Sequence, residues 1–305
     1  MLTSGGEVRN DFKRYLRPEV VSRLGRTELV ARLVVEGFLT GLHRSPYHGF
    51  SVEFAEYRPY LPGDPLRDVD WKVYGKTDRL YVKEYEEETN LKAYVLLDGS
   101  NSMGFASGEV TKFEYSKYLA ASLCYLLLKQ RDAVGLVVFR EGVTSYLPPR
   151  SVPSYLYELL RGLPPSPRGR TQLGPALHSL AERVTKRGLV VVLSDLMDDP
   201  DEVLAGLKHL RHRKHEIIVF HILDPAELSF PFQEPATFRG MEGEGEVSLE
   251  PWHVKEDYRR MVSDWVGRLE GECREHGIDY TLLRTSDPYD VALLRYLARR
   301  RAMAS

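Results

Sequence analysis

The sequence predicts an α/β protein: a doubly wound, mostly parallel sheet with a smaller N-terminal α+β unit. From residue 92 onward, short apolar runs alternate with amphipathic helical segments, which is typical of a parallel sheet. The run 93–97 is apolar throughout and bounded by polar residues, as expected of a strand that is buried on both faces. Residues 1–90 lack this alternation, and we therefore predict two units, 1–90 and 91–305.

The expected elements follow in order along the chain. In the first unit we expect helices at 18–24 and 27–38 and a strand at 79–88, which should belong to a small sheet of its own. The strands expected in the second unit are 92–97, 133–139, 143–147, 189–194, 216–223 and 279–284. The helices expected there are 113–130, 151–162, 173–186, 200–212, 253–276 and 288–300. The connector 140–142 is short enough for a hairpin, so the third of these strands should be antiparallel.

Composition narrows the functional classes. A net charge of -2 offers no general attraction to nucleic acid or to an anionic membrane. Cys124 and Cys273 form neither a disulfide framework nor a metal-binding spacing, which fits a reducing compartment. The longest nearly apolar run, 118–128, is too short to cross a bilayer. We expect a cytoplasmic protein with no membrane span and no nucleic-acid partner.

Oxygen-bearing side chains follow the first strand of the second unit. Asp98, Ser100 and Ser102 occupy alternate positions, and in a tight turn such groups can converge on one point. One carboxylate and two hydroxyls are hard ligands that suit Mg²⁺, Mn²⁺ or Ca²⁺. The alternative is an ordinary polar turn in which a serine caps the next helix.

The direction of the chain brings further oxygens to the same edge. With the third strand antiparallel, the loops 98–104, 163–172 and 195–199 all lie at the carboxyl edge of the sheet, where open α/β sheets bind ligands. Thr171 and Asp195 lie in the second and third of these loops.

These residues resemble the metal-ion-dependent adhesion site of von Willebrand factor type A domains, which is Asp-x-Ser-x-Ser followed by a Thr and an Asp. The resemblance covers about residues 92–300 and fills all five positions: Asp98, Ser100, Ser102, Thr171 and Asp195. It implies that the two serines ligate the ion directly and that the other three do so directly or through water. It also implies an open coordination position that an acidic side chain of a partner protein can take.

A second resemblance concerns residues 53–88, which are similar to the signature of the domain-of-unknown-function 58 family. The matching residues are Tyr60, Pro62, Gly63, Asp64, Arg67, Asp70 and Trp71. We expect the segment 60–71 to pack against the second unit, with Tyr60 and Trp71 supplying the apolar area. The resemblance implies a MoxR-type AAA+ ATPase as a candidate partner. The expected function is thus a divalent-metal-dependent protein-interaction module, an adaptor for such an ATPase in the assembly or maturation of other proteins.

A metal-dependent hydrolase is the alternative function. Asp195 followed by His221 or His253 has the order of an α/β-hydrolase triad, but the first glycine of Gly-x-Ser-x-Gly is missing around Ser102. A haloacid-dehalogenase-type phosphatase would need Asp at position 100, where the chain has Ser100. We therefore assign no catalytic residue.

The segment 224–252 is expected to be a long irregular insert with a mobile glycine-rich run at 240–246. It begins at the edge of the predicted metal loops and carries Glu227, Glu234, Glu242, Glu244, Glu246 and Glu250. We hypothesise that it shapes access to the site, and that one of its carboxylates can fill the open coordination position as an internal plug. The alternative is a solvated connector without a role.

Overall fold

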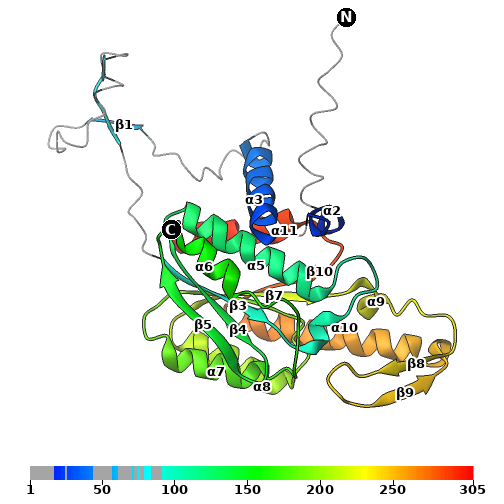
Figure 1. Cartoon of the computed structure of the whole chain (residues 1–305). Coiled ribbons are helices and arrows are strands. Elements are labelled where there is room, and N and C mark those ends of the chain that lie inside the picture. The colour runs from blue at the N-terminus through cyan, green and yellow to red at the C-terminus, as the bar shows by residue number, and fades with distance from the viewer. Residues whose placement is uncertain are drawn as a thin grey trace, which may run out of the picture.

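A computed structural model describes residues 17–24, 26–43, 57–60, 71, 74–75, 79–83 and 91–304. Its centre is a six-stranded sheet with the strand order β10-β7-β6-β3-β4-β5 (Figure 1). The strands are β3 (Lys92–Asp98), β4 (Ala133–Phe139), β5 (Val143–Arg150), β6 (Leu189–Ser194), β7 (Glu216–Leu223) and β10 (Asp279–Arg284). All neighbouring pairs are parallel except β4 and β5, so the predicted hairpin and the doubly wound topology are confirmed.

Helices cover both faces of the sheet (Figure 1). One layer contains α5 (Lys112–Lys129), α6 (Tyr155–Gly162) and α11 (Tyr289–Ala304). The other contains α7 (Leu173–Arg183), α8 (Pro200–His212) and α10 (Pro251–Glu275). The pleat of β3 divides its side chains between the two cores, because Val95 and Leu97 pack on the first layer whereas Tyr94 and Leu96 pack on the second. Each fully buried side chain of this kind contributes about 1.5–3 kcal/mol.

The N-terminal helices share the first core. They are α2 (Pro18–Ser22) and α3 (Thr27–His43), and the buried face of α3 carries Val30, Val34 and Phe38. These side chains belong to the same hydrophobic cluster as α5 and α11. The helical part of residues 1–90 therefore packs directly on the sheet domain, while the boundary at residue 90 stays a prediction.

The strand expected at 79–88 includes β2 (Tyr81–Lys83), which pairs with β1 (Tyr57–Pro59) in a separate antiparallel sheet, as predicted. This small hairpin lies apart from the central sheet in Figure 1. Our expectation that Trp71 packs on the second unit is wrong, since its side chain is 58% exposed and meets the edge of the Tyr74 ring. The signature residues between 61 and 70 lie outside the described residues.

The segment 224–252 is not irregular. It forms α9 (Pro225–Ser229) and a hairpin of β8 (Ala236–Arg239) and β9 (Glu246–Leu249). Pro225 and Pro251 stand at the start of α9 and α10, where a missing N–H costs nothing, so these prolines begin helices rather than prevent them. The glycine-rich run is the turn of the hairpin, with positive φ at Gly243 and Gly245.

Candidate metal centre

Three loops bring the five predicted ligands to one place at the carboxyl edge of the sheet. Leu97 on β3 is paired with Leu193 on β6, so the residues that end these neighbouring strands emerge side by side. Ser102 lies in the short 3₁₀ helix η2 (Asn101–Gly104), which directly follows the turn after β3. All five residues are buried, with relative solvent exposures of 0% for Asp98, Ser100 and Asp195 and 7% for Ser102 and Thr171.

The hydroxyl oxygens of this group have the spacing of metal ligands. Ser100 Oγ lies 3.0 Å from Ser102 Oγ, which lies 3.5 Å from Thr171 Oγ1. Adjacent ligands of an octahedral Mg²⁺ with bonds of about 2.1 Å are about 3.0 Å apart. The donor set is therefore all oxygen, buried and suitably spaced, and it fits a hard divalent cation.

The two carboxylates make the centre electronegative. Burial and the neighbouring negative charge of Asp195 raise the pKa of Asp98 to about 7. The Asp98 carboxylate is held in place by two donors, since Ser100 N donates to Oδ1 at 2.9 Å and Ser194 Oγ donates to Oδ2 at 2.6 Å. Buried, oriented carboxylates that repel each other are stabilised when a cation lies between them.

Lys112 is a buried partner of this centre that the sequence analysis missed. Its Nζ donates to Asp195 at 2.8 Å and to Glu227 at 2.6 Å, and its side chain is fully buried. Burial alone would lower the pKa of Lys112, but the two carboxylates outweigh burial and raise it, so the ammonium stays charged. One lysine thus offsets part of the negative charge and links the insert, through Glu227, to the metal loops.

Glu242, in the turn between β8 and β9, reaches the same group of oxygens. Its Oε1 accepts hydrogen bonds from Thr171 Oγ1 at 2.8 Å and from Ser102 N at 3.2 Å. Its Oε2 accepts from Thr171 N at 2.7 Å. The insert therefore contacts the centre, as hypothesised, and Glu242 is the glutamate that does so through the predicted ligands.

The residues of the alternative hydrolase are not assembled into a triad in the described structure. The hydroxyl of Ser102 is bonded to those of Ser100 and Thr171 rather than to a histidine. His221 is buried, which lowers its pKa to about 3, and its Nδ1 is bonded to the hydroxyl of Tyr280. His253 lies on the surface beside Glu250.

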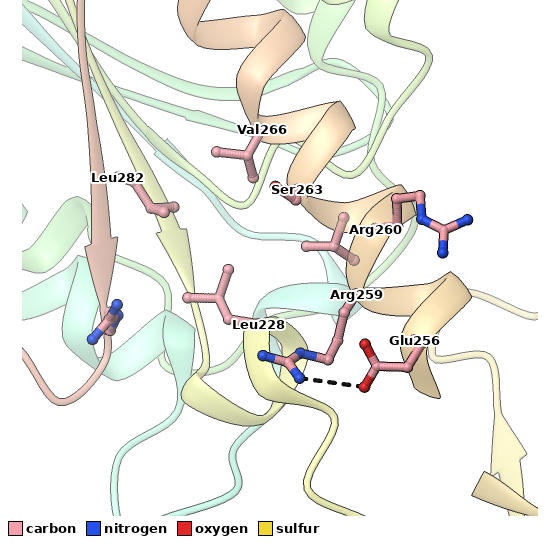
Figure 2. A pocket seen from close by; sticks show the side chains of 9 residues that line it. Leu228, Glu256, Arg259, Arg260, Ser263, Val266 and Leu282 are labelled. Atoms are coloured by element: carbon pink, nitrogen blue, oxygen red, sulfur yellow. Dashed lines mark hydrogen bonds and ion pairs between the residues drawn. The ribbon is translucent and has the colours of Figure 1, made fainter. Parts of the chain in front are cut away.

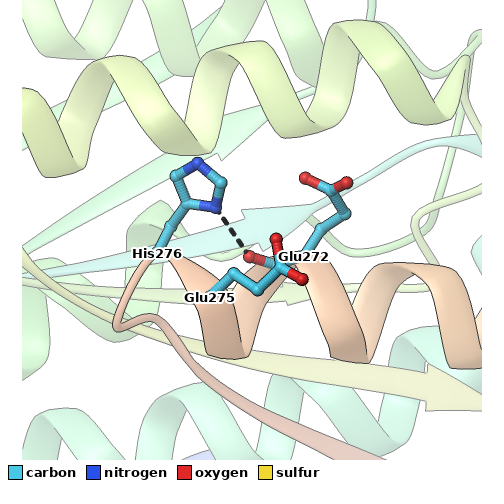
Figure 3. Close-up of side chains that lie close together, drawn as sticks. All are labelled: Glu272, Glu275 and His276. Carbon is cyan, nitrogen blue, oxygen red and sulfur yellow. Dashed lines mark hydrogen bonds between the residues drawn. The ribbon is translucent and has the colours of Figure 1, made fainter.

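Two other features of the described surface are separate from this centre. Figure 3 shows Glu272, Glu275 and His276, whose ligating atoms lie within 4.8 Å of one another. Glu272 is already paired with Lys208 at 2.8 Å, and exposed groups of this kind are common without a metal. A cleft of about 510 Å³ lies between α9, α10 and β10. Its lining includes Leu228, Arg259 and Leu282 (Figure 2) but none of the five predicted ligands.

The strand order, the antiparallel edge strand and the helices on both faces define a doubly wound, mostly parallel α/β domain whose loops gather at the carboxyl edge of the sheet. The chain belongs to the family described as protein of unknown function DUF58, whose model matches residues 56–265. The family suggested by the signature around Tyr60 and Trp71 is thereby confirmed.

The chain is similar to mycobacterial proteins that are described as uncharacterised. The uncharacterised protein Mb1516 of Mycobacterium bovis is 25% identical over 93% of this chain and 90% of its own length. Among solved structures, the hypothetical protein BatB of Bacteroides thetaiotaomicron has 18% identity and a TM-score of 0.48, and the alignment covers 70% of this chain and 99% of BatB. An aerotolerance-related membrane protein of Bacteroides fragilis has 19% identity and a TM-score of 0.44 over 68% and 99% of the two chains. Across the described residues of the present chain, no helix is both long and apolar enough to cross a membrane.

Proposed function

We propose that this protein is a divalent-metal-dependent protein-interaction module. The metal is Mg²⁺, or Mn²⁺ or Ca²⁺, and the residues that would hold it are Asp98, Ser100, Ser102, Thr171 and Asp195. The observation that carries this proposal is the buried row of hydroxyl oxygens, 3.0 Å and 3.5 Å apart, beside two carboxylates. When bound, the cation supplies a positive charge with room for one more oxygen ligand, which favours a carboxylate from a partner protein.

The protein residues perform the positioning. Ser194 and the backbone of Ser100 orient the Asp98 carboxylate, and Lys112 holds one oxygen of Asp195. Backbone N–H groups of Ser102 and Thr171 point toward a carboxylate, which Glu242 supplies in this structure. A carboxylate-binding position therefore adjoins the predicted metal ligands.

The resemblance of the signature to the DUF58 family supports a more specific proposal about the partner. We propose that the module acts in the cytoplasm as an adaptor for a MoxR-type AAA+ ATPase in the assembly or maturation of other proteins. Capture of this ATPase from a cell extract by the wild-type chain, and its loss when a chelator is added, would support the proposal. Capture that the chelator does not change would argue against a metal-dependent contact.

A calorimetric titration tests the metal site itself. Mn²⁺ is expected to bind the wild-type chain with one site, and Asp98→Ala is expected to weaken binding at least about tenfold because a charged ligand is lost. The matched control is Glu275→Ala, which removes a carboxylate from the exposed group of Figure 3 and should leave the affinity unchanged. Equal Mn²⁺ affinity in the wild type and Asp98→Ala, with the fold intact by circular dichroism, would refute the metal site.

A further inference from the structure

The turn between β8 and β9 covers the candidate metal centre and is held there by several contacts. Besides the three hydrogen bonds to the Glu242 carboxylate, Arg170 Nε donates to the carbonyl oxygen of Glu242 at 2.9 Å. A methyl group placed on Gly104, the last residue of η2, would lie 3.4 Å from Met241 Cε. The side chain of Met241, next to Glu242 in the turn, therefore also packs over η2. These contacts join one turn to two of the three metal loops.

The Glu242 carboxylate lies next to the predicted ligand Thr171 at a spacing typical of neighbouring metal ligands. Its Oε1 lies 2.8 Å from Thr171 Oγ1, a separation similar to that expected between adjacent oxygens around Mg²⁺, about 3.0 Å. Two backbone N–H groups and one hydroxyl donate to this carboxylate, and they would do the same for any carboxylate placed there.

The structure of the hairpin allows its turn to move away from the candidate metal centre while the base of the hairpin stays packed. The base is anchored by an aromatic cluster in which the Phe238 ring on β8 lies 5.5 Å from Phe230 and 5.1 Å from Phe232. The two strands have four residues each, and among the described strands they pair only with one another. Side chains such as Val247 are exposed. An isolated two-stranded hairpin is marginally stable, so release of the turn disturbs little else.

We propose that Glu242 is an internal ligand that occupies the carboxylate-binding position intended for the partner. The partner then has to present an acidic side chain that displaces Glu242 and moves the β8–β9 turn away from η2. This inference rests on the proposed function for its use of the metal, but the carboxylate position itself is formed by Ser102 and Thr171 of this chain. Because a tethered ligand competes at an effective concentration on the order of millimolar, the wild-type site is largely masked from weak external carboxylates.

The test uses a peptide of known sequence as the external carboxylate. The probe is a fluorescent synthetic peptide of residues 236–249, compared with the same peptide carrying Gln at its position 242. Glu242→Gln in the full-length chain keeps the side chain's size but removes its charge and replaces one of the two accepting oxygens by an NH₂ group, so the side chain can no longer accept through both positions. We expect this variant to bind the acidic peptide at least about tenfold more tightly than the wild type does, and to bind the Gln peptide weakly.

The matched control is Glu246→Gln, which makes the same charge change in the same hairpin but at a residue paired with Arg239. It should bind the peptide as the wild type does. Hydrogen exchange gives a second measurement, since excess acidic peptide should speed exchange of the amides at 240–245 in the wild type. Equal peptide binding by the wild type and Glu242→Gln, or no change in exchange at the turn, would overturn the inference.

The two proposals can fail separately. Absence of Mn²⁺ binding in the wild type would refute the proposed function, and the peptide comparison in EDTA would then decide the inference. Tighter peptide binding by Glu242→Gln in EDTA supports an internal ligand that needs no metal. Normal Mn²⁺ binding together with equal peptide binding refutes the internal ligand and leaves the metal site standing.

Discussion

Lys112 lies between two carboxylates that come from different segments of the chain. Its ammonium is paired with Asp195 at the end of β6 and with Glu227 in α9, and the Lys112 and Asp195 side chains are fully buried. A buried charge without a partner of opposite sign raises the free energy of the folded state far more than a buried ion pair does. The lysine therefore stabilises the fold around the candidate metal centre and limits the negative charge there.

At the residue scale, we expect Lys112→Met to lower the free energy of unfolding by about 3–5 kcal/mol, because Asp195 and Glu227 lose their common partner. Urea unfolding at pH 7 in the absence of added metal measures the change. Lys117→Met is the matched control on the same helix, where the lysine lies near the Phe113 and Tyr118 rings, and it should cost less than about 1 kcal/mol. Similar losses for the two variants would contradict the assigned role of Lys112.

At the element scale, α7 and α8 pack closely through glycine. A Cβ at Gly206 would lie 2.7 Å from Leu177 Cβ and 3.1 Å from the Gly174 carbonyl oxygen. Such separations are too short for carbon atoms, so a side chain at this position would push the two helices apart. The two helices follow the loops that contain Thr171 and Asp195, so a change in their separation would also shift these loops.

We therefore expect Gly206→Ala to destabilise the protein by about 1–3 kcal/mol, although alanine is the better helix former by about 1 kcal/mol. The control is Gly267→Ala in α10, where a Cβ would meet nothing within 4 Å. There the higher helix propensity of alanine should stabilise the protein by up to about 1 kcal/mol. Thermal unfolding of both variants measures the difference. A stabilised Gly206→Ala would show that α7 and α8 can separate at little cost.

At the scale of the whole molecule, α3 is part of the core although it precedes the sheet domain by about fifty residues. Phe38 is 3% exposed and packs in the cluster of α5, whereas Leu29 on the same helix is 42% exposed. We expect Phe38→Ala to cost about 3–5 kcal/mol and Leu29→Ala less than about 1 kcal/mol, measured by urea unfolding of the full chain. A small effect of Phe38→Ala would mean that α3 docks only weakly.

Much of the architecture could be predicted from local patterns. The buried strands are short apolar runs such as 93–97, and the direction of each strand followed from the hairpin at 140–142. The direction of the strands also predicted that the loops of Asp98, Thr171 and Asp195 lie at one edge of the sheet. The structure brings these residues together there. Metal binding at that edge stays a prediction. Patterns failed where proline and glycine were taken as signs of irregularity, because their effect depends on position within a helix or turn.

Local sequence patterns predict the alternation of strands and helices, and with it the edge of the sheet at which the polar loops gather. They do so because the burial of a strand and the reversal of the chain depend on residues that are neighbours in the sequence. Three contacts are visible only in the folded chain. Lys112 pairs with Asp195, α3 packs on α5, and Glu242, one of the six glutamates in the segment 224–252, contacts Thr171. Each of these contacts joins segments tens of residues apart, and its energy depends on burial and distance that no local pattern contains.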